Sequence, residues 1–140
     1  MALENPSKTI KKTDEAGKEL IIELLDGQVT GGFDIDSVYK INGKWTILEL
    51  LKCDTVRPHD SHPNRYWFKN KRKFISLWEI AQDLKGSLFL LNYENDRKQF
   101  LLIEVLGIDE EKGITKEIKT KLTLEEAKSW FKKLNNHNID

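Results

Sequence analysis

The chain has 140 residues, of which 39% are hydrophobic and 33% are charged, and its formal net charge is zero. This balance is typical of a globular protein and excludes general disorder, and the length favours one domain over residues 1–140. No apolar run approaches the roughly 20 residues that span a bilayer, and MALENPSKTIKK lacks the apolar core of a signal peptide. Because the single cysteine, Cys53, cannot form an internal disulfide, we expect a cytoplasmic protein with no membrane contact.

The first third of the chain predicts a polar, mobile end, a helix and a β-hairpin. Residues 1–12 are polar and rich in lysine. Residues 14–26 place leucines and isoleucines at helical spacing before Gly27, and the alternative for KELIIELL is a strand. The runs FDIDSVYKI and KWTILELLKC alternate as strands do. Asn42-Gly43 joins them, and this pair favours a two-residue hairpin turn.

The remainder predicts a loop, a long helix, two strands and a last helix. Residues 54–65 hold two prolines and form the loop, and residues 64–85 form a helix that ends near Gly86. SLFLLNYE and QFLLIEVLGI are apolar strands, separated by the polar turn NDRK. Thr123 and Glu126 form a capping box before the last helix. The expected fold is therefore mixed α/β, with helices on both faces of a central sheet.

Glu49 is the conspicuous residue of the second hairpin strand, because it lies at the centre of the most apolar run of the chain. Burying a carboxylate there costs several kcal/mol unless a partner compensates it. A two-residue turn pairs Ile41 with Lys44, and counting on from that pair places Asp36 opposite Glu49. Two carboxylates so placed repel each other.

A bound cation would make this acid pair favourable, since hard divalent ions such as Mg²⁺ or Mn²⁺ take carboxylate ligands. Asp34 lies two residues before Asp36 and is either a third acid of the cluster or a residue of the strand entrance. In the structural alternative, Asp36 caps the loop or pairs with Lys52.

Over about residues 14–93 the chain resembles the core of the PD-(D/E)XK nuclease superfamily. The shared order is a leading helix, an acid on one hairpin strand, Glu and Lys on the next strand, and then a basic helix. The resemblance implies a restriction-endonuclease-like core with a mixed sheet of four to five strands. It also implies Mg²⁺-dependent hydrolysis of DNA, with Asp36 and Glu49 as metal ligands and Lys52 as the catalytic lysine. Many small nucleases of this fold act as dimers, so the resemblance also implies a homodimer.

The spacing of ELLK departs from this family, which separates acid and lysine by one residue. In a regular strand Lys52 points away from Glu49, whereas a β-bulge at Leu50-Leu51 would bring it back. Without a bulge, Lys52 is structural or a helix lysine replaces it, the candidates being Lys69, Lys71 and Lys73. Glu19 or Glu23 of the first helix is a further candidate ligand.

The stretch RYWFKNKRKF mixes aromatic and basic residues, as nucleic-acid surfaces do. The predicted phosphate contacts are Arg65, Lys69, Lys71, Arg72 and Lys73. The alternative is a solvated lysine face over core aromatics, and we assign Phe74 and Trp78 to the core.

Two further features carry weaker signals. HDSH places His59, Asp60 and His62 in a loop, which is too few ligands for structural zinc but leaves a role near substrate open. Cys53 is expected to be a packed thiol.

The functional alternatives to a nuclease are a noncatalytic nucleic-acid-binding or protein-interaction domain of the same fold, and a small assembly protein that associates through edge strands.

Overall fold

The computed structural model describes residues 13–136, which fall into two units. Residues 13–34 form the first unit and residues 35–136 belong to the second. The predicted mobile end, residues 1–12, lies outside the described residues. No helix in the described part of the chain is both long enough and apolar enough to cross a bilayer.

The first unit holds helix α1, Thr13–Leu25, followed by residues without regular structure. The predicted helix is confirmed, and Gly27 after it has a φ of 87°. Its aliphatic side chains are largely exposed, including Leu20, Ile22 and Leu24. Glu19, Glu23 and Asp34 belong to this unit, whereas Asp36 and Glu49 belong to the second.

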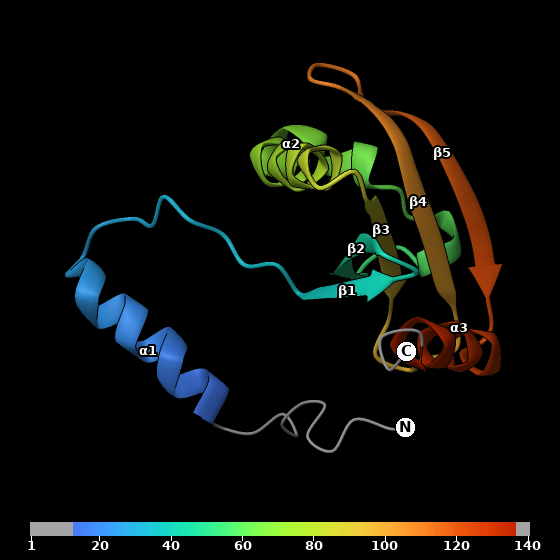
Figure 1. The fold of residues 1–140 in the computed structure, drawn as a ribbon, viewed down its shortest axis with the longest axis horizontal. Helices are drawn as coiled ribbons and strands as arrows, with labels where there is room; N and C mark the ends of the chain where they lie inside the picture. Colours follow the sequence, from blue (N-terminus) through green and yellow to red (C-terminus); the bar gives the residue numbers. More distant parts are fainter. Residues whose placement is uncertain (1–12, 137–140) are drawn as a thin grey trace. The chain divides into compact units, whose positions relative to one another are not determined.

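The second unit is a five-stranded mixed sheet in the order β1-β2-β3-β4-β5 (Figure 1). The strands are β1 Ser37–Ile41, β2 Lys44–Lys52, β3 Ser87–Tyr93, β4 Phe100–Asp109 and β5 Gly113–Leu122. Only β2 and β3 pair in parallel, because the loop and helix α2, Trp67–Asp83, cross over between them. The predicted fold class, a mixed α/β fold with a sheet of four to five strands, is confirmed.

The hairpin has the predicted register, with Ile41 opposite Lys44 and Ser37 opposite Leu48. Asn42 and Gly43 both have positive φ, 50° and 81°, as the two-residue turn requires. Along β2, the pairing with β3 runs without a shift from Thr46 to Lys52. The strand therefore has no bulge at Leu50-Leu51.

Neighbouring strand residues point to opposite faces, so the sheet separates two cores. On one face α2 packs Phe74, Leu77 and Ala81 against the sheet. On the other, helix α3, Leu124–Asn136, packs Ala127 and Leu134. The predicted capping box of α3 is confirmed: Glu126 N donates to Thr123 Oγ1 at 3.2 Å and Thr123 N donates to Glu126 Oε1 at 2.9 Å.

Two boundaries differ from the sequence prediction. The helix predicted from residue 64 begins at Trp67, after two short 3₁₀ helices, η1 Pro58–Asp60 and η2 Pro63–Tyr66. The helix predicted to run to residue 85 ends at Asp83, and Lys85, with a φ of 55°, takes the left-handed conformation just after it. Gly86 is needed there for another reason, since a Cβ would collide with the carbonyl oxygen of Trp45.

Strand β5 is absent from the predicted element order, which runs from the second apolar strand directly to the last helix. Its sequence, GITKEIKTKL, is mostly polar because β5 is an edge strand with many exposed positions. Lys116, Lys119 and Lys121 are exposed along it. Lysines on an edge strand oppose pairing with another chain, so this edge disfavours the assembly alternative.

Candidate active site

Glu49 lies on the α2 face of β2 and is only 3% exposed. Lys73 of α2 reaches down to it, with its Nζ 2.5 Å from Glu49 Oε2. The other carboxylate oxygen, Oε1, is buried without a hydrogen-bond partner. Of the two oxygens of the buried Glu49 carboxylate, therefore, one has a partner in the protein and the other has none.

Asp36 stands directly before β1, and its carboxylate is close enough to Glu49 of β2 to act on it electrostatically. Leu50 N donates to Asp36 Oδ2 at 2.8 Å, so this carboxylate extends the β1–β2 ladder by one side-chain bond. Its negative charge also acts on the nearby carboxyl group. Burial raises the pKa of Glu49 to about 7, and the Asp36 carboxylate contributes to the increase although Lys73 opposes it.

The two candidate lysines have different environments. Lys52 alternates away from Glu49 on the regular strand, and its Nζ lies 3.5 Å from Asp54 Oδ1 at the surface. Lys73, one of the three helix lysines named as replacements, makes the contact instead. Lys52 is not the partner of Glu49, because the bulge that would redirect it is missing.

A pocket of about 270 Å³ opens beside Glu49 and Lys73. Asn70 and Lys73 of α2 line it together with Tyr66 of η2, and Leu50, Leu51 and Lys52 line it from β2. A second hollow of about 360 Å³ also contains Tyr66, together with Arg65. Sequence reasoning missed Asn70, although its spacing from Lys73 was the signal that could have identified it.

The predicted phosphate contacts divide into free and paired cations. Arg65, Lys69 and Arg72 are exposed and have no acidic partner among the described residues. Lys71 Nζ lies 3.7 Å from Glu111 Oε1, and Lys73 is committed to Glu49. The exposed cations therefore lie on α2 or in the turn before it, and Arg65 lines the hollow next to the pocket.

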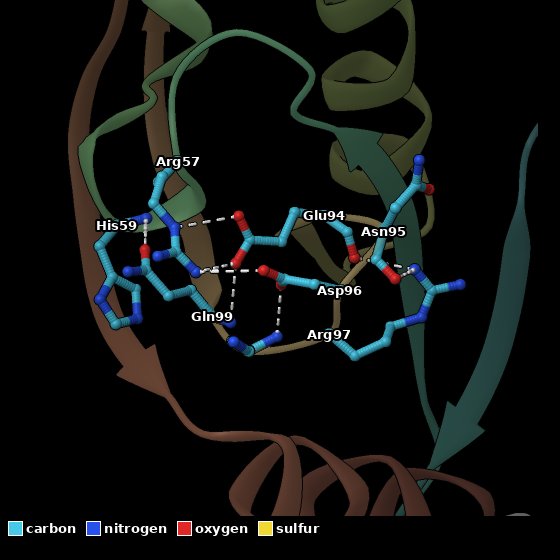
Figure 2. Close-up of polar contacts among 8 residues, drawn as sticks. Arg57, His59, Glu94, Asn95, Asp96, Arg97 and Gln99 are labelled. Atoms are coloured by element: carbon cyan, nitrogen blue, oxygen red, sulfur yellow. Dashed lines mark hydrogen bonds and ion pairs between the residues drawn. The ribbon is translucent and has the colours of Figure 1, made fainter.

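The loop before α2 is held by a second polar cluster, shown in Figure 2. Arg57 donates to both oxygens of Glu94, at 3.1 Å from Nε and 2.6 Å from Nη2. Gln99 N donates to Glu94 Oε2 at 3.1 Å, and Asp96 Oδ2 lies 3.6 Å from Arg57 Nη2. Sequence reasoning did not anticipate this cluster, because its members lie on separate segments.

His62 and Cys53 have structural partners, whereas the ring Nε2 of His59 is buried without a hydrogen-bond partner. His62 accepts from Asn64 N at 3.0 Å through Nδ1, so its Nε2, 2.6 Å from Glu117 Oε1, carries the proton that it donates. His59 N donates to Gln99 Oε1 at 3.3 Å. Cys53 is half-buried, and burial raises the pKa of its thiol.

Within residues 13–136, no three His, Cys, Asp or Glu side chains gather closely enough to hold a metal ion by themselves. Asp36 and Glu49 form a pair, so an ion bound there would take further ligands from water or substrate. No protein-family model, curated protein or solved structure matches the chain.

Proposed function

We propose that the second unit is a Mg²⁺-dependent endonuclease that hydrolyses phosphodiester bonds in DNA. The supporting observation is the meeting of Glu49, Asp36 and Lys73 beside a pocket with basic residues around it. This arrangement extends the resemblance to PD-(D/E)XK nucleases, with the lysine supplied by α2 in place of β2.

The donor set fits a hard divalent cation. Glu49 Oε1 is a buried carboxylate oxygen without a hydrogen-bond partner, and Asp36 uses only Oδ2 in its bond to Leu50 N. Carboxylate oxygens are the ligands that Mg²⁺ or Mn²⁺ accepts, with water completing the shell. Asp36 and Glu49 would hold the ion, which would neutralise charge developing on the scissile phosphate.

The side chains around the acids would position the substrate. The Lys73 ammonium places a fixed positive charge at the pocket, where it would stabilise the phosphate and orient the attacking water. The water oxygen forms a bond to phosphorus and the water loses a proton, while the bond between phosphorus and one ester oxygen breaks and the leaving oxygen takes up a proton. Lys52 and Arg65 line the adjoining hollow and would contact flanking phosphates.

A noncatalytic nucleic-acid-binding or protein-interaction domain is the second candidate. The observation that favours it is the same ion pair, because Lys73 balances the charge of Glu49 without any ion. In that case the acid pair is structural and only the exposed cations have a role in binding.

A cleavage assay separates the two candidates. Wild type, Asp36→Ala and Glu49→Ala are incubated with supercoiled plasmid, single-stranded DNA and branched DNA in Mg²⁺ or Mn²⁺. Glu104→Ala is the matched control, since Glu104 lies in β4 on the face away from Glu49. Metal-dependent cutting by wild type and the control, lost in both folded acid variants, supports the nuclease. DNA binding without cutting by any protein supports the second candidate.

A further inference from the structure

Phe68 is the exposed aromatic residue of α2, with 73% of its surface accessible. The other aromatic residues of this helix are engaged in the core. Trp67 stacks on Phe74 with ring centroids 5.8 Å apart, and its Nε1 donates to Glu110 O at 2.9 Å. Trp67 is therefore part of the core, whereas the Phe68 ring is exposed at the surface.

Phe68 lies among the basic residues of α2. Lys71 and Arg72 follow it at i+3 and i+4, the spacings that make neighbours on a helix surface. Lys71 Nζ lies 5.6 Å from the ring centroid, within the range of a cation–π contact. Lys69 and Arg72 are exposed and have no acidic partner in the described part of the chain.

The charge of this surface selects its partner. The first turn of α2 has no acidic residue, and its first acid is Glu79, beyond the basic segment. A polyanion fits such a surface, whereas an acidic or apolar peptide would leave either the ring or several cations unused. An aromatic ring beside phosphate-binding cations is the combination that holds unpaired bases, because the bases of a duplex are already stacked on one another.

We propose that Phe68 stacks on an unpaired base of single-stranded DNA whose phosphates contact Lys69 and Arg72. The inference deepens the proposed function and rests on it for one step: the strand held by Phe68 would be the strand cut at Glu49, which Lys73 of the same helix contacts. The substrate class of the site is then DNA with an unpaired stretch, such as a single strand or a flap.

The test is a binding titration of the full chain in EDTA, where no cutting interferes. The probes are a single-stranded oligonucleotide with one 2-aminopurine, whose fluorescence responds to stacking, and the matching duplex. The variants are Phe68→Ala and Phe68→Leu, the second of which keeps apolar bulk but removes the ring. Phe131→Ala is the control, since Phe131 is an exposed phenylalanine on α3, on the opposite sheet face.

Wild type and Phe131→Ala are expected to bind the single strand and change its fluorescence. Both Phe68 variants should bind it roughly tenfold more weakly, with the fluorescence change lost, because one stacked base is removed. Their duplex affinity should stay close to that of wild type. The inference is overturned if Phe68→Leu binds the single strand as wild type does, or if both variants lose single-strand and duplex binding equally.

Failure of the nuclease and failure of the stacking give different results. Loss of single-strand binding in the Phe68 variants, with no cutting by wild type in Mg²⁺, supports stacking and rejects the nuclease. Cutting by wild type, with Phe68→Ala binding the single strand at full affinity, rejects stacking and leaves the nuclease standing.

Discussion

Glu49, inside β2, and Glu94, directly after the neighbouring parallel strand β3, are both buried carboxylates, yet their surroundings differ. Glu94 receives two bonds from Arg57 and one from Gln99 N, so both of its oxygens have donors. Glu49 has one lysine contact, one oxygen without a partner and a second acid, Asp36, beside it. The difference indicates that Glu94 increases the stability of the fold, while the charged form of Glu49 lowers it.

A buried acid with incomplete compensation is the arrangement expected of a functional site. A fully bonded acid is expected of a structural clamp, and Figure 2 shows Glu94 as the centre of such a clamp. Substitutions at the two glutamates should therefore affect different properties of the protein.

The largest effect is expected from the lysine of the Glu49 site. Lys73→Ala should lower the rate of metal-dependent DNA cleavage by roughly 100-fold or more, since it removes a fixed charge that stabilises the transition state. Lys52→Ala should lower the rate much less, because Lys52 pairs with Asp54 in place of Glu49 and would contact only the phosphates beside the cut bond. Initial rates on plasmid DNA, with circular dichroism to verify folding, test this. Equal losses of cleavage rate in both variants would mean that Lys52 contributes to the chemistry as much as Lys73 does.

The pH dependence of stability should distinguish Glu49 from a fully bonded acid. Its pKa is raised to about 7, so the folded state favours the protonated form and stability falls as pH rises from about 4.5 through 7. The loss is on the order of 3 kcal/mol and should be absent in Glu49→Gln. Urea unfolding of both proteins in EDTA between pH 4.5 and 8 measures it. Parallel curves for the two proteins would contradict the raised pKa.

The two amide substitutions should have opposite effects on the free energy of unfolding at pH 7.5. Glu94→Gln should destabilise the protein by about 1–3 kcal/mol, because three donors lose a charged acceptor. Glu49→Gln should be neutral or stabilising, since it relieves a desolvated charge beside Asp36. Denaturant midpoints with unchanged slopes provide the comparison. Equal destabilisation by both would mean that Glu49 is also a structural acid.

The smallest effect is expected at the rim of the Glu94 clamp. Asp96→Asn should leave the urea midpoint unchanged, because the carboxylate is half exposed and lies 3.6 Å from an Arg57 already bonded to Glu94. A clear drop in the midpoint would show that the clamp works as a network of three charges.

Local patterns of the sequence predicted most of the fold. Asn42-Gly43 determined the hairpin register, and Thr123 with Glu126 predicted the start of α3, because both signals act within a few residues. Strand β5 escaped prediction since its edge position lets polar residues replace the apolar ones that mark a buried strand. The 3₁₀ helices before α2 depend on contacts with distant residues, such as Asn64 with Ile114.

The candidate site was predictable up to its lysine. The hairpin register brings Asp36 towards Glu49, and that step needs only the turn. Choosing Lys73 over Lys52 requires knowing that β2 has no bulge and that α2 crosses above Glu49, which are tertiary facts. The Glu94 clamp joins residues 37 positions apart in sequence and carries no local signal at all.

The most direct measurement is calorimetric titration of Mg²⁺ and Mn²⁺ into wild type, Asp36→Asn, Glu49→Gln and Glu94→Gln. If the incompletely compensated acid is a metal ligand, wild type and Glu94→Gln bind an ion while Asp36→Asn and Glu49→Gln do not. Equal binding heats in all four proteins, or none in any of them, would contradict a metal site at Glu49 and leave its buried charge as a structural feature of the sheet.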